Sequence, residues 1–148
     1  MKQRFETPPE DLLFVTILRT ADRLSQQAEQ VIKLSGLTAT QYNVLRILRG
    51  AEPDGLPCRV IADRMISRDP DMTRLLDRLE KHGHIARERQ KDDRRVIKTR
   101  ITVAGLKQLK KLDQPVHELH QRQFRHMRSA HLKQLGELLQ EAGKGESD

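Results

Sequence analysis

Apolar residues recur along most of the chain at the three- and four-residue spacing of helices that bury one face. The first such segment follows Thr7-Pro-Pro-Glu10, which predicts a helix capped by Thr7, with Glu10 completing a capping box. Further apolar residues outside its main seam predict that the first turns are buried on several sides, which a helix from a second chain would explain. The seam comprises Phe14, Ile17, Ala21, Leu24, Ala28 and Val31, and the further residues are Leu12, Leu13, Val15 and Leu18.

Two shorter helices are predicted next. Thr38 and Gln41 form a second capping box, and the helix that they open ends near Gly50. Pro57 then begins a short helix. The residues expected to face the core are Val44, Leu45, Ile47 and Leu48 on the first helix and Val60, Ile61 and Met65 on the second.

The helix predicted from Pro70 to His82 has two unlike faces. Asp69 is its expected N-cap, Pro70 its first residue and Gly83 its C-terminal stop. At about 100° per residue, four apolar side chains gather on one side of the helix. They are Met72, Leu75, Leu76 and Leu79, while Pro70, Arg74, Asp77 and Lys81 lie opposite, with Thr73 and Arg78 on the flanks.

Two short segments rich in β-branched residues follow, Ile85 to Arg89 and Val96 to Ile101, and the turn from Gln90 to Arg95 makes them a predicted hairpin. Two short helices and then a basic hairpin are typical of a winged helix-turn-helix. The fold class predicted is therefore mainly α, with a small β-hairpin wing.

Two more helices are predicted after the hairpin. Thr102 should cap a long helix, in which Pro115 predicts a kink or a break. Ser129 should cap the last helix, and residues 143–148 should fray. The apolar positions are Leu106, Leu109, Leu112, Val116 and Leu119, then Leu132, Leu135, Leu138 and Leu139.

The charge balance indicates what kind of partner the protein binds. The chain has 28 Lys and Arg against 21 Asp and Glu, a net charge of +7. That excess favours nucleic acid or an anionic membrane surface, although a merely soluble basic protein would also show it. Five of these seven charges lie between Arg59 and Arg100, in the predicted helix-turn-helix and hairpin. With 3% aromatic residues and no tryptophan, duplex DNA is a better target than single strands that bind by stacking.

The polar face of helix 70–82 fits a major groove, because arginine can donate two hydrogen bonds to a guanine edge. We expect base contact from Arg74 and phosphate contact from Thr73, Arg78 and Lys81. The alternative is an ordinary solvated face stabilised by an ion pair between Asp77 and Lys81.

The hairpin turn, Lys91-Asp-Asp-Arg-Arg95, places basic side chains at the tip of a protruding loop. A minor groove attracts such arginines, most strongly where A·T tracts narrow it. Asp93 should pair with one arginine and fix its direction. The alternative is a charged β-turn with local salt bridges, each worth about 0.2–1 kcal/mol.

Several segments in this order and spacing resemble the MarR family of transcriptional regulators. The resemblance covers about residues 12–139. It is carried by Leu37-Thr-Ala-Thr-Gln-Tyr-Asn-Val-Leu45, Thr73-Arg-Leu-Leu-Asp-Arg-Leu-Glu80, Gly83, Asp93-Arg-Arg95 and Ile101-Thr-Val-Ala-Gly-Leu106.

The resemblance implies a single MarR-like chain over residues 1–148, two copies of which form a triangular homodimer. Residues 36–101 would form the winged helix-turn-helix DNA-binding lobe, and residues 7–35 with 102–142 the N- and C-terminal dimerisation helices. In the family's wing motif the arginine reaches the minor groove and the aspartate supports the wing, which implies these roles for Arg95 and Asp93. The expected DNA-binding residues are Arg68, Pro70, Thr73, Arg74, Arg78, Lys81, Asp93, Arg94 and Arg95.

Other chemistry has little support in the sequence. Cys58 is interpreted as an inert, half-buried thiol, and one cysteine suits a reducing cytoplasm. His117 and His120 are followed by His126 and His131, but these histidines are loosely spaced and lie on different faces, so we expect solvated histidines and no metal or cofactor. No catalytic motif is present, which argues against an enzyme. We also expect no signal peptide and no membrane partner, because the start is polar and its apolar stretches are short.

We therefore expect a cytoplasmic regulator that binds a pseudo-palindromic duplex site as a homodimer. The resemblance favours repression relieved by a small aromatic or phenolic effector, although activation stays open. The rival interpretation is a winged helix used only as a protein-interaction module, without specific DNA binding.

Overall fold

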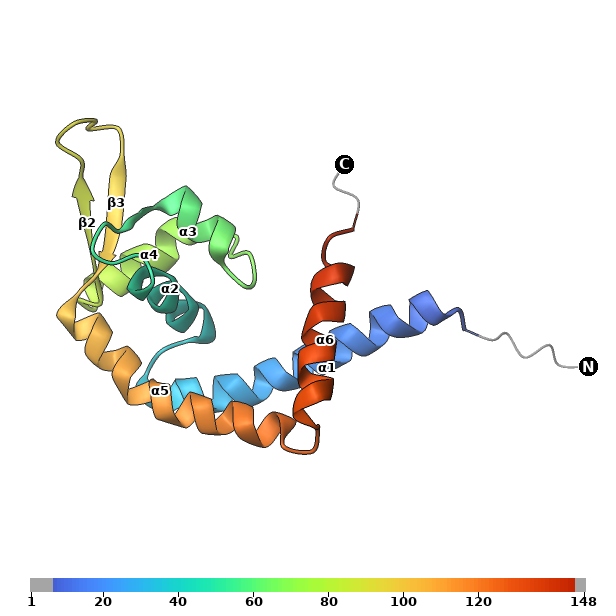
Figure 1. Ribbon diagram of the computed structural model, residues 1–148. Helices are drawn as coiled ribbons and strands as arrows, with labels where there is room; N and C mark the ends of the chain where they lie inside the picture. The colour runs from blue at the N-terminus through green and yellow to red at the C-terminus, as the bar shows by residue number, and fades with distance from the viewer. Residues whose placement is uncertain (1–6, 146–148) are drawn as a thin grey trace, which may run out of the picture.

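The structure is a computed structural model that describes residues 7–145. It is mainly helical with a small antiparallel sheet, which confirms the predicted fold class (Figure 1). In chain order the elements are α1 (Pro9–Ile32), the 3-10 helix η1 (Lys33–Ser35), α2 (Ala39–Arg49), β1 (Leu56–Pro57), α3 (Cys58–Arg64), α4 (Met72–Lys81), β2 (Ile85–Arg89), β3 (Ile97–Ile101), α5 (Val103–Phe124) and α6 (Ser129–Ala142).

The wing is a three-stranded antiparallel sheet in the order β1-β3-β2. β2 and β3 pair from Ile85 opposite Ile101 to Arg89 opposite Ile97, which confirms the predicted hairpin. The two-residue strand β1 was not predicted, because so short a segment has no alternating pattern. It begins after Gly55, whose φ is 69° and whose missing Cβ would lie 2.6 Å from the Thr99 carbonyl oxygen. Any larger residue there would hold β1 away from β3.

One hydrophobic core joins the winged helix to the long helices. Four leucines and one isoleucine at its centre are at most 1% exposed, and burying each such side chain stabilises the fold by about 1.5–3 kcal/mol. They are Leu45, Leu48, Ile61, Leu76 and Leu79. Ile32 from α1 and Leu109, Leu112 and Val116 from α5 belong to the same core. The two long helices are thus fixed to the winged helix at their nearer ends.

Two of the predicted helix N-caps, Thr38 and Thr102, are confirmed. At α2 the capping box is complete, with Gln41 N donating to Thr38 Oγ1 (3.2 Å) and Thr38 N donating to Gln41 Oε1 (3.0 Å). At α5, Thr102 Oγ1 accepts from Gly105 N (3.1 Å) and also donates to the Gly83 carbonyl oxygen (2.6 Å). Thr102 therefore caps α5 and ties it to the end of α4.

Three other predicted caps were wrong. α1 begins at Pro9 with Pro8 as N-cap, and Thr7 forms no capping box, because a residue before proline avoids the helical region and Pro8 precedes Pro9. α4 begins at Met72, because Asp71 and not Asp69 caps it. Ser129 is the first helical residue of α6, after Arg128 in extended conformation.

Pro115 does not break α5, which runs unbroken from Val103 to Phe124 and follows a curved path in Figure 1. Proline removes one backbone donor from the helix. The neighbouring residues Leu112 and Val116 are 3% and 5% exposed, so burial against the core holds this turn in place.

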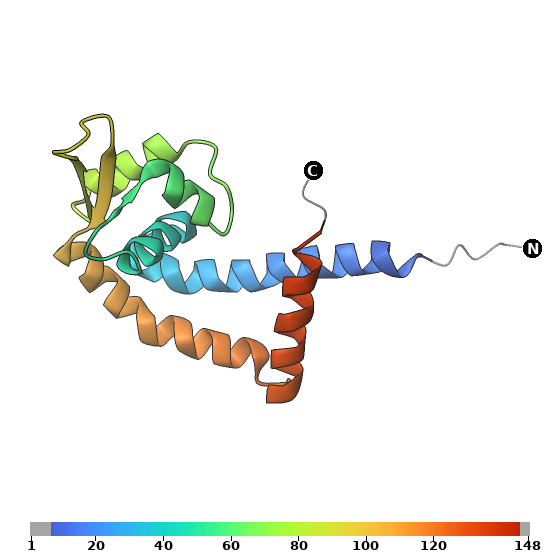
Figure 2. The ribbon, with the colours of Figure 1, turned by 45° about the horizontal axis from the view of Figure 1, so that its top comes forward.

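The first turns of α1 and nearly the whole length of α6 expose apolar side chains. The first turns of α1 extend away from the rest of the chain (Figure 2). The chain exposes 12134 Å², whereas a compact monomer of 17.2 kDa exposes about 7,800 Å². The exposed apolar residues are Leu12, Leu13, Phe14, Val15 and Leu18 on α1 and Leu132, Leu135, Leu138 and Leu139 on α6.

Candidate nucleic-acid interface

Helix α4 is seated by one apolar face. Leu75, Leu76 and Leu79 are 7%, 1% and 1% exposed, and Met72 is half-buried, as the spacing predicts. The face turned to solvent carries four of the predicted contact residues. They are Thr73, Arg74, Arg78 and Lys81, all exposed.

The start of α4 lies against the start of α2. The Asp71 carboxylate accepts from Arg74 N (3.0 Å), and the Asp69 carboxylate accepts from Asp71 N (2.8 Å). Arg74 and Arg78 line an open cavity of about 280 Å³ at this junction. Its remaining lining residues are Thr38, Thr40, Gln41, Asp69, Asp71 and Leu75. The α2 residues in this group were not predicted as site residues, because the sequence showed them only as a capping box.

Two predicted contact residues lie before α4 and not on it. Arg68 and Pro70 are exposed in the segment between α3 and α4, since the helix begins at Met72. They are therefore beside the N-terminus of α4, which adds a favourable dipole for phosphate to any contact that they make.

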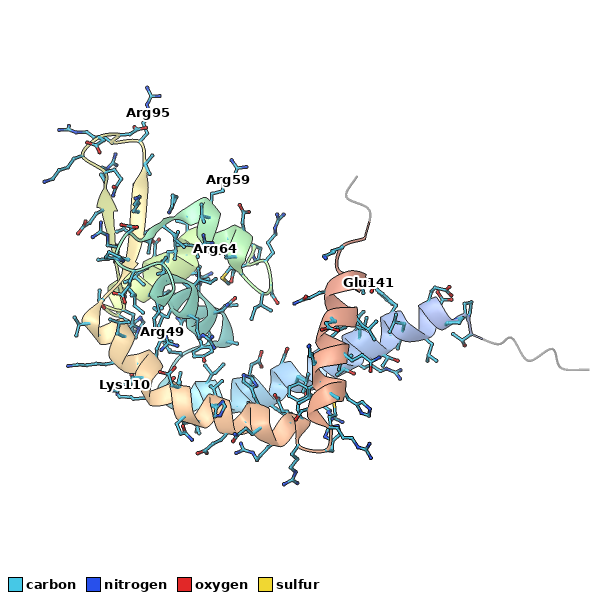
Figure 3. All side chains as sticks on the ribbon, in the orientation of Figure 1. Arg49, Arg59, Arg64, Arg95, Lys110 and Glu141 are labelled. Atoms are coloured by element: carbon cyan, nitrogen blue, oxygen red, sulfur yellow. The ribbon has the colours of Figure 1, made fainter. Side chains whose placement is uncertain are left out.

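The tip of the wing is shaped by Asp93. Its carboxylate accepts from the backbone N–H of Arg95 (3.0 Å), and its carbonyl oxygen accepts from Val96 N (3.0 Å). The predicted pairing of Asp93 with an arginine guanidinium was wrong, because Asp93 is in none of the salt bridges within residues 7–145 and its Oδ1 bonds the backbone of Arg95 instead. Asp93 thus orders the loop, and Arg94 and Arg95 remain exposed, with Arg95 at its outer end in Figure 3.

Arg87 connects the wing to α4, and it was not singled out from the sequence. It lies on β2 opposite the buried Thr99, and its guanidinium binds Glu80 and Asp77 of α4. Hydrogen bonding to Glu80 and Asp77 raises the pKa of Arg87, although burial opposes the rise, and the bond from Arg87 lowers the pKa of Glu80. The sequence did contain one signal for this contact, an arginine on the inward face of a predicted strand. Such an arginine needs a carboxylate partner on the element that packs against the strand.

The ion pairs leave the predicted contact residues available to a ligand. Within residues 7–145 the salt bridges are Arg49–Asp113, Arg87–Asp77 and Arg87–Glu80. Asp77 therefore pairs with Arg87 and not with Lys81, so the alternative of a face stabilised by an Asp77–Lys81 pair was wrong. Arg59 on α3 is a further exposed arginine, and it points to the same side of the molecule as Arg95 (Figure 3).

Comparison with known proteins places this geometry in a family. The model of the MarR family matches residues 37–97, which include α2, α3, α4 and the wing as far as the start of β3. The crystal structure of a MarR transcription factor from Planctomyces limnophilus is 39% identical, with a TM-score of 0.68, and the match covers 93% of this chain and 98% of that one. The chain belongs to the MarR family.

Other relatives agree with this assignment to the MarR family. The HTH-type transcriptional repressor IacR from Pseudomonas putida is 27% identical over 131 residues, which are 88% of this chain and 77% of IacR. A mutant MarR from E. coli complexed with operator DNA is 22% identical, with a TM-score of 0.80 over 88% of this chain and 92% of that one. The second likeness concerns the fold alone.

A larger cavity of this MarR-family chain is lined by α1, α2, α5 and the segment that follows α3. It has a volume of about 690 Å³. Its lining residues are Ser25, Ala28, Glu29, Ile32, Ala39, Thr40, Tyr42, Asn43, Arg46, Ile47, Met65, Ile66, Ser67, Val116 and His120. Arg46 lies over the Tyr42 ring, with its guanidinium carbon 5.9 Å from the ring centroid.

Residues that could serve other chemistry are few. Cys58 is exposed at the start of α3 and not half-buried as predicted. In the part of the chain that the structure describes, no group of three His, Cys, Asp or Glu side chains is arranged to hold a metal ion. In the same part no helix combines the length and the apolar character needed to cross a membrane.

Proposed function

We propose that this MarR-family protein regulates transcription by binding a pseudo-palindromic duplex DNA site as a homodimer. The observation that carries the proposal is the pairing of two basic elements. α4 buries its leucines and exposes Arg74, Arg78 and Lys81, and beside it the wing presents Arg94 and Arg95. A helix with this polarity fits a major groove, and a basic loop next to it reaches the adjacent minor groove.

Each expected contact residue has a role in this proposal. Arg74 reads a base edge, because it lies in the first turn of α4, and recognition helices contact bases with their N-terminal residues. Thr73, Arg78 and Lys81 bind phosphate from the flanks of the helix, and Arg68 and Pro70 approach the backbone next to its start. Arg95 enters the minor groove, Arg94 binds the backbone beside it, and Asp93 maintains the turn.

The homodimer is supported by the exposed apolar ends of α1 and α6. Leu13 and Phe14 are 54% and 64% exposed, and Leu138 is 54% exposed, which is unfavourable in water for a contiguous patch. A second copy related by a two-fold axis would cover both helices with the same surface. We accordingly assign residues 7–35 and 102–142 to dimerisation and residues 36–101 to DNA binding.

Repression relieved by a small aromatic acid is the regulatory mode that the larger cavity favours. Its volume of about 690 Å³ suits a small molecule. Arg46 offers a cation for a carboxylate, and the Tyr42 ring beside it offers an aromatic surface. A ligand bound between α1 and the helix-turn-helix would change DNA affinity only if it prefers a spacing of the two lobes that does not fit the operator.

Selection of bound fragments from random duplex DNA tests the proposal. The protein should enrich a pseudo-palindrome whose half-sites lie about one helical turn apart, since two α4 helices would occupy successive major grooves. If instead no sequence is enriched and binding changes little with salt, the chain is a protein-interaction module.

The effector is tested with benzoate as the probe. Benzoate should lower the affinity of the wild-type protein for the enriched site, and Arg46→Gln should remove this response while leaving DNA affinity without benzoate unchanged. If benzoate acts equally on both proteins, Arg46 does not bind it, and if it acts on neither, this cavity takes no small aromatic acid.

A further inference from the structure

Three charged side chains meet where α4 faces β2. Arg87 Nε donates to Glu80 Oε2 (3.0 Å), and Arg87 Nη2 donates to Glu80 Oε1 (3.0 Å) and to Asp77 Oδ1 (2.6 Å). The Arg87 side chain is 25% exposed, less than either carboxylate. A bidentate arginine–carboxylate contact has a defined geometry, unlike a single bond between two long side chains.

Besides the apolar packing of Ile85 and Ile101 in the core shared with α4, two polar attachments join α4 to the wing, and this cluster is the second. The first is at the base, where Gly83 N donates to the Glu80 carbonyl oxygen (2.9 Å) and His84 N donates to the Leu79 carbonyl oxygen (2.9 Å). Thr102 closes the base by its bond to Gly83. The cluster adds a contact to α4 two residues farther along β2 than the buried Ile85, which restricts how far the ribbon can tilt about its packed base.

The outer part of the wing has little else to hold it. β1 pairs only with Lys98 and Thr99 of β3, so Arg89 and Ile97 belong to a two-stranded ribbon. Isolated two-stranded hairpins are marginally stable in water. The direction of the ribbon, and hence of Arg95, therefore depends on how its lower half is fixed, to α4 through β2 and to α2 and α3 through β3.

The charges of the cluster argue against a direct role in DNA binding. One guanidinium faces two carboxylates, so the cluster is net negative and would repel phosphate. Arg87 also directs its Nε and Nη2 toward the helix and not toward solvent. A role in positioning the wing therefore explains the cluster better than a role in attracting DNA.

We propose that Arg87 is a positioning residue that fixes the wing relative to α4 and thereby sets the distance between the major-groove and minor-groove contacts. The inference rests on the proposed function, because it assigns a part of the same DNA interface. Its consequence is a fixed spacing, within each half-site, between the bases read by α4 and the A·T-rich step read by Arg95.

The test compares DNA selected from a random duplex pool by the wild-type protein, Arg87→Gln and Arg100→Gln. Arg100→Gln is the matched control, since it removes the same charge from an exposed position on β3 next to Thr99. Arg87→Gln should keep the core sequence read by α4 but lose the fixed A·T-rich flank, with discrimination between flanks reduced about tenfold. Wild type and Arg100→Gln should keep both features. Thermal unfolding of each variant establishes that it is folded.

A second set of variants separates position from charge. The triple variant Arg87→Gln, Asp77→Asn, Glu80→Gln carries one more positive charge than wild type and should still lack flank discrimination, whereas Arg87→Lys should restore part of it. If the triple variant regains wild-type discrimination, the cluster acts through charge and the inference is wrong. The inference is also wrong if Arg87→Gln selects the wild-type flank, or if it lowers affinity for all sequences alike with a smaller salt dependence. If the wild-type protein itself enriches no site, the proposed function fails first.

Discussion

At the scale of single residues, the arginines of α4 and the wing differ in their surroundings. Arg74 is in the first helical turn, and its backbone N–H is already fixed by Asp71. Arg87, in contrast, is fully engaged with carboxylates. A free guanidinium held on a rigid helix is suited to reading bases, and an engaged one is suited to holding structure.

Arg74→Ala should weaken binding to the selected site by about 1–3 kcal/mol and relax the preference at one position per half-site. The reason is the loss of a bidentate contact to a guanine edge. Binding titrations against duplexes with each base at that position measure the effect. An equal loss on all of these duplexes would identify Arg74 as a phosphate contact.

His84 provides a prediction about pH. Partial burial, and then the neighbouring His82 ring, lower its pKa below the ordinary value of 6.5. The unfolded chain therefore binds a proton more readily than the folded one, so the free energy of unfolding should fall as the pH drops below about 6.5. Urea unfolding at several pH values measures this. His84→Leu should flatten the dependence, whereas His117→Gln, at an exposed position, should keep it.

At the scale of elements, the features that depend on the local spacing of residues were predicted correctly from the sequence. The leucines of α4 at positions 75, 76 and 79, the Thr38 capping box and the hairpin from Ile85 to Ile101 all follow from periodicity and side-chain hydrogen bonds within a few residues. The start of α4 was misplaced by two residues, since Asp69 and Asp71 are both competent caps.

Features that depend on tertiary contact could not be obtained from spacing. The bond between Arg87 and Glu80 spans a turn whose direction is set by Gly83 and Thr102. β1 exists only because β3 lies beside it, and Pro115 is tolerated only because its neighbours are buried. The site residues on α4 and the wing were predictable, whereas the contact that joins these two elements was not.

Arg95 and Asp93 of the wing should contribute to the same preference for A·T-rich flanks. Arg95→Ala should weaken binding mainly to sites with A·T-rich flanks, because a narrow minor groove attracts arginine. Asp93→Ala should give a milder form of the same defect, since it removes the bond that fixes the backbone of Arg95. Titration of both variants against A·T-rich and G·C-rich flanks at one salt concentration checks this. Equal losses on both flanks would mean that Arg95 binds phosphate.

At the scale of the whole molecule, α1 and α6 both extend beyond the winged helix (Figure 1). Leu24 on the predicted seam of α1 is half-buried, and its carbonyl oxygen accepts from Gln123 of α5 (3.1 Å), so a charge there would disturb the chain's own packing. Phe14, 64% exposed, is the cleaner test of the interface between copies.

Phe14→Asp should convert the dimer to monomers and weaken binding to the full DNA site, because it places a charge in an apolar interface. Sedimentation equilibrium measures the first effect and titration of a full site the second. Gln30→Asp introduces the same charge at an exposed polar position of α1 and should change neither. If the Phe14→Asp protein is still a dimer at the protein concentrations at which the wild type is a dimer, this end of α1 lies outside the interface.

The central claim is that the full chain, as a dimer, recognises a particular duplex sequence through α4 and the wing. The most direct measurement is an anisotropy titration of the selected duplex and of a shuffled duplex of equal composition, over a series of salt concentrations. The account predicts two chains per selected duplex, affinity for it at least about 10³-fold above that for the shuffled duplex, and steep loss of both affinities with salt. Equal affinity for the two duplexes, or binding that salt does not weaken, would contradict it.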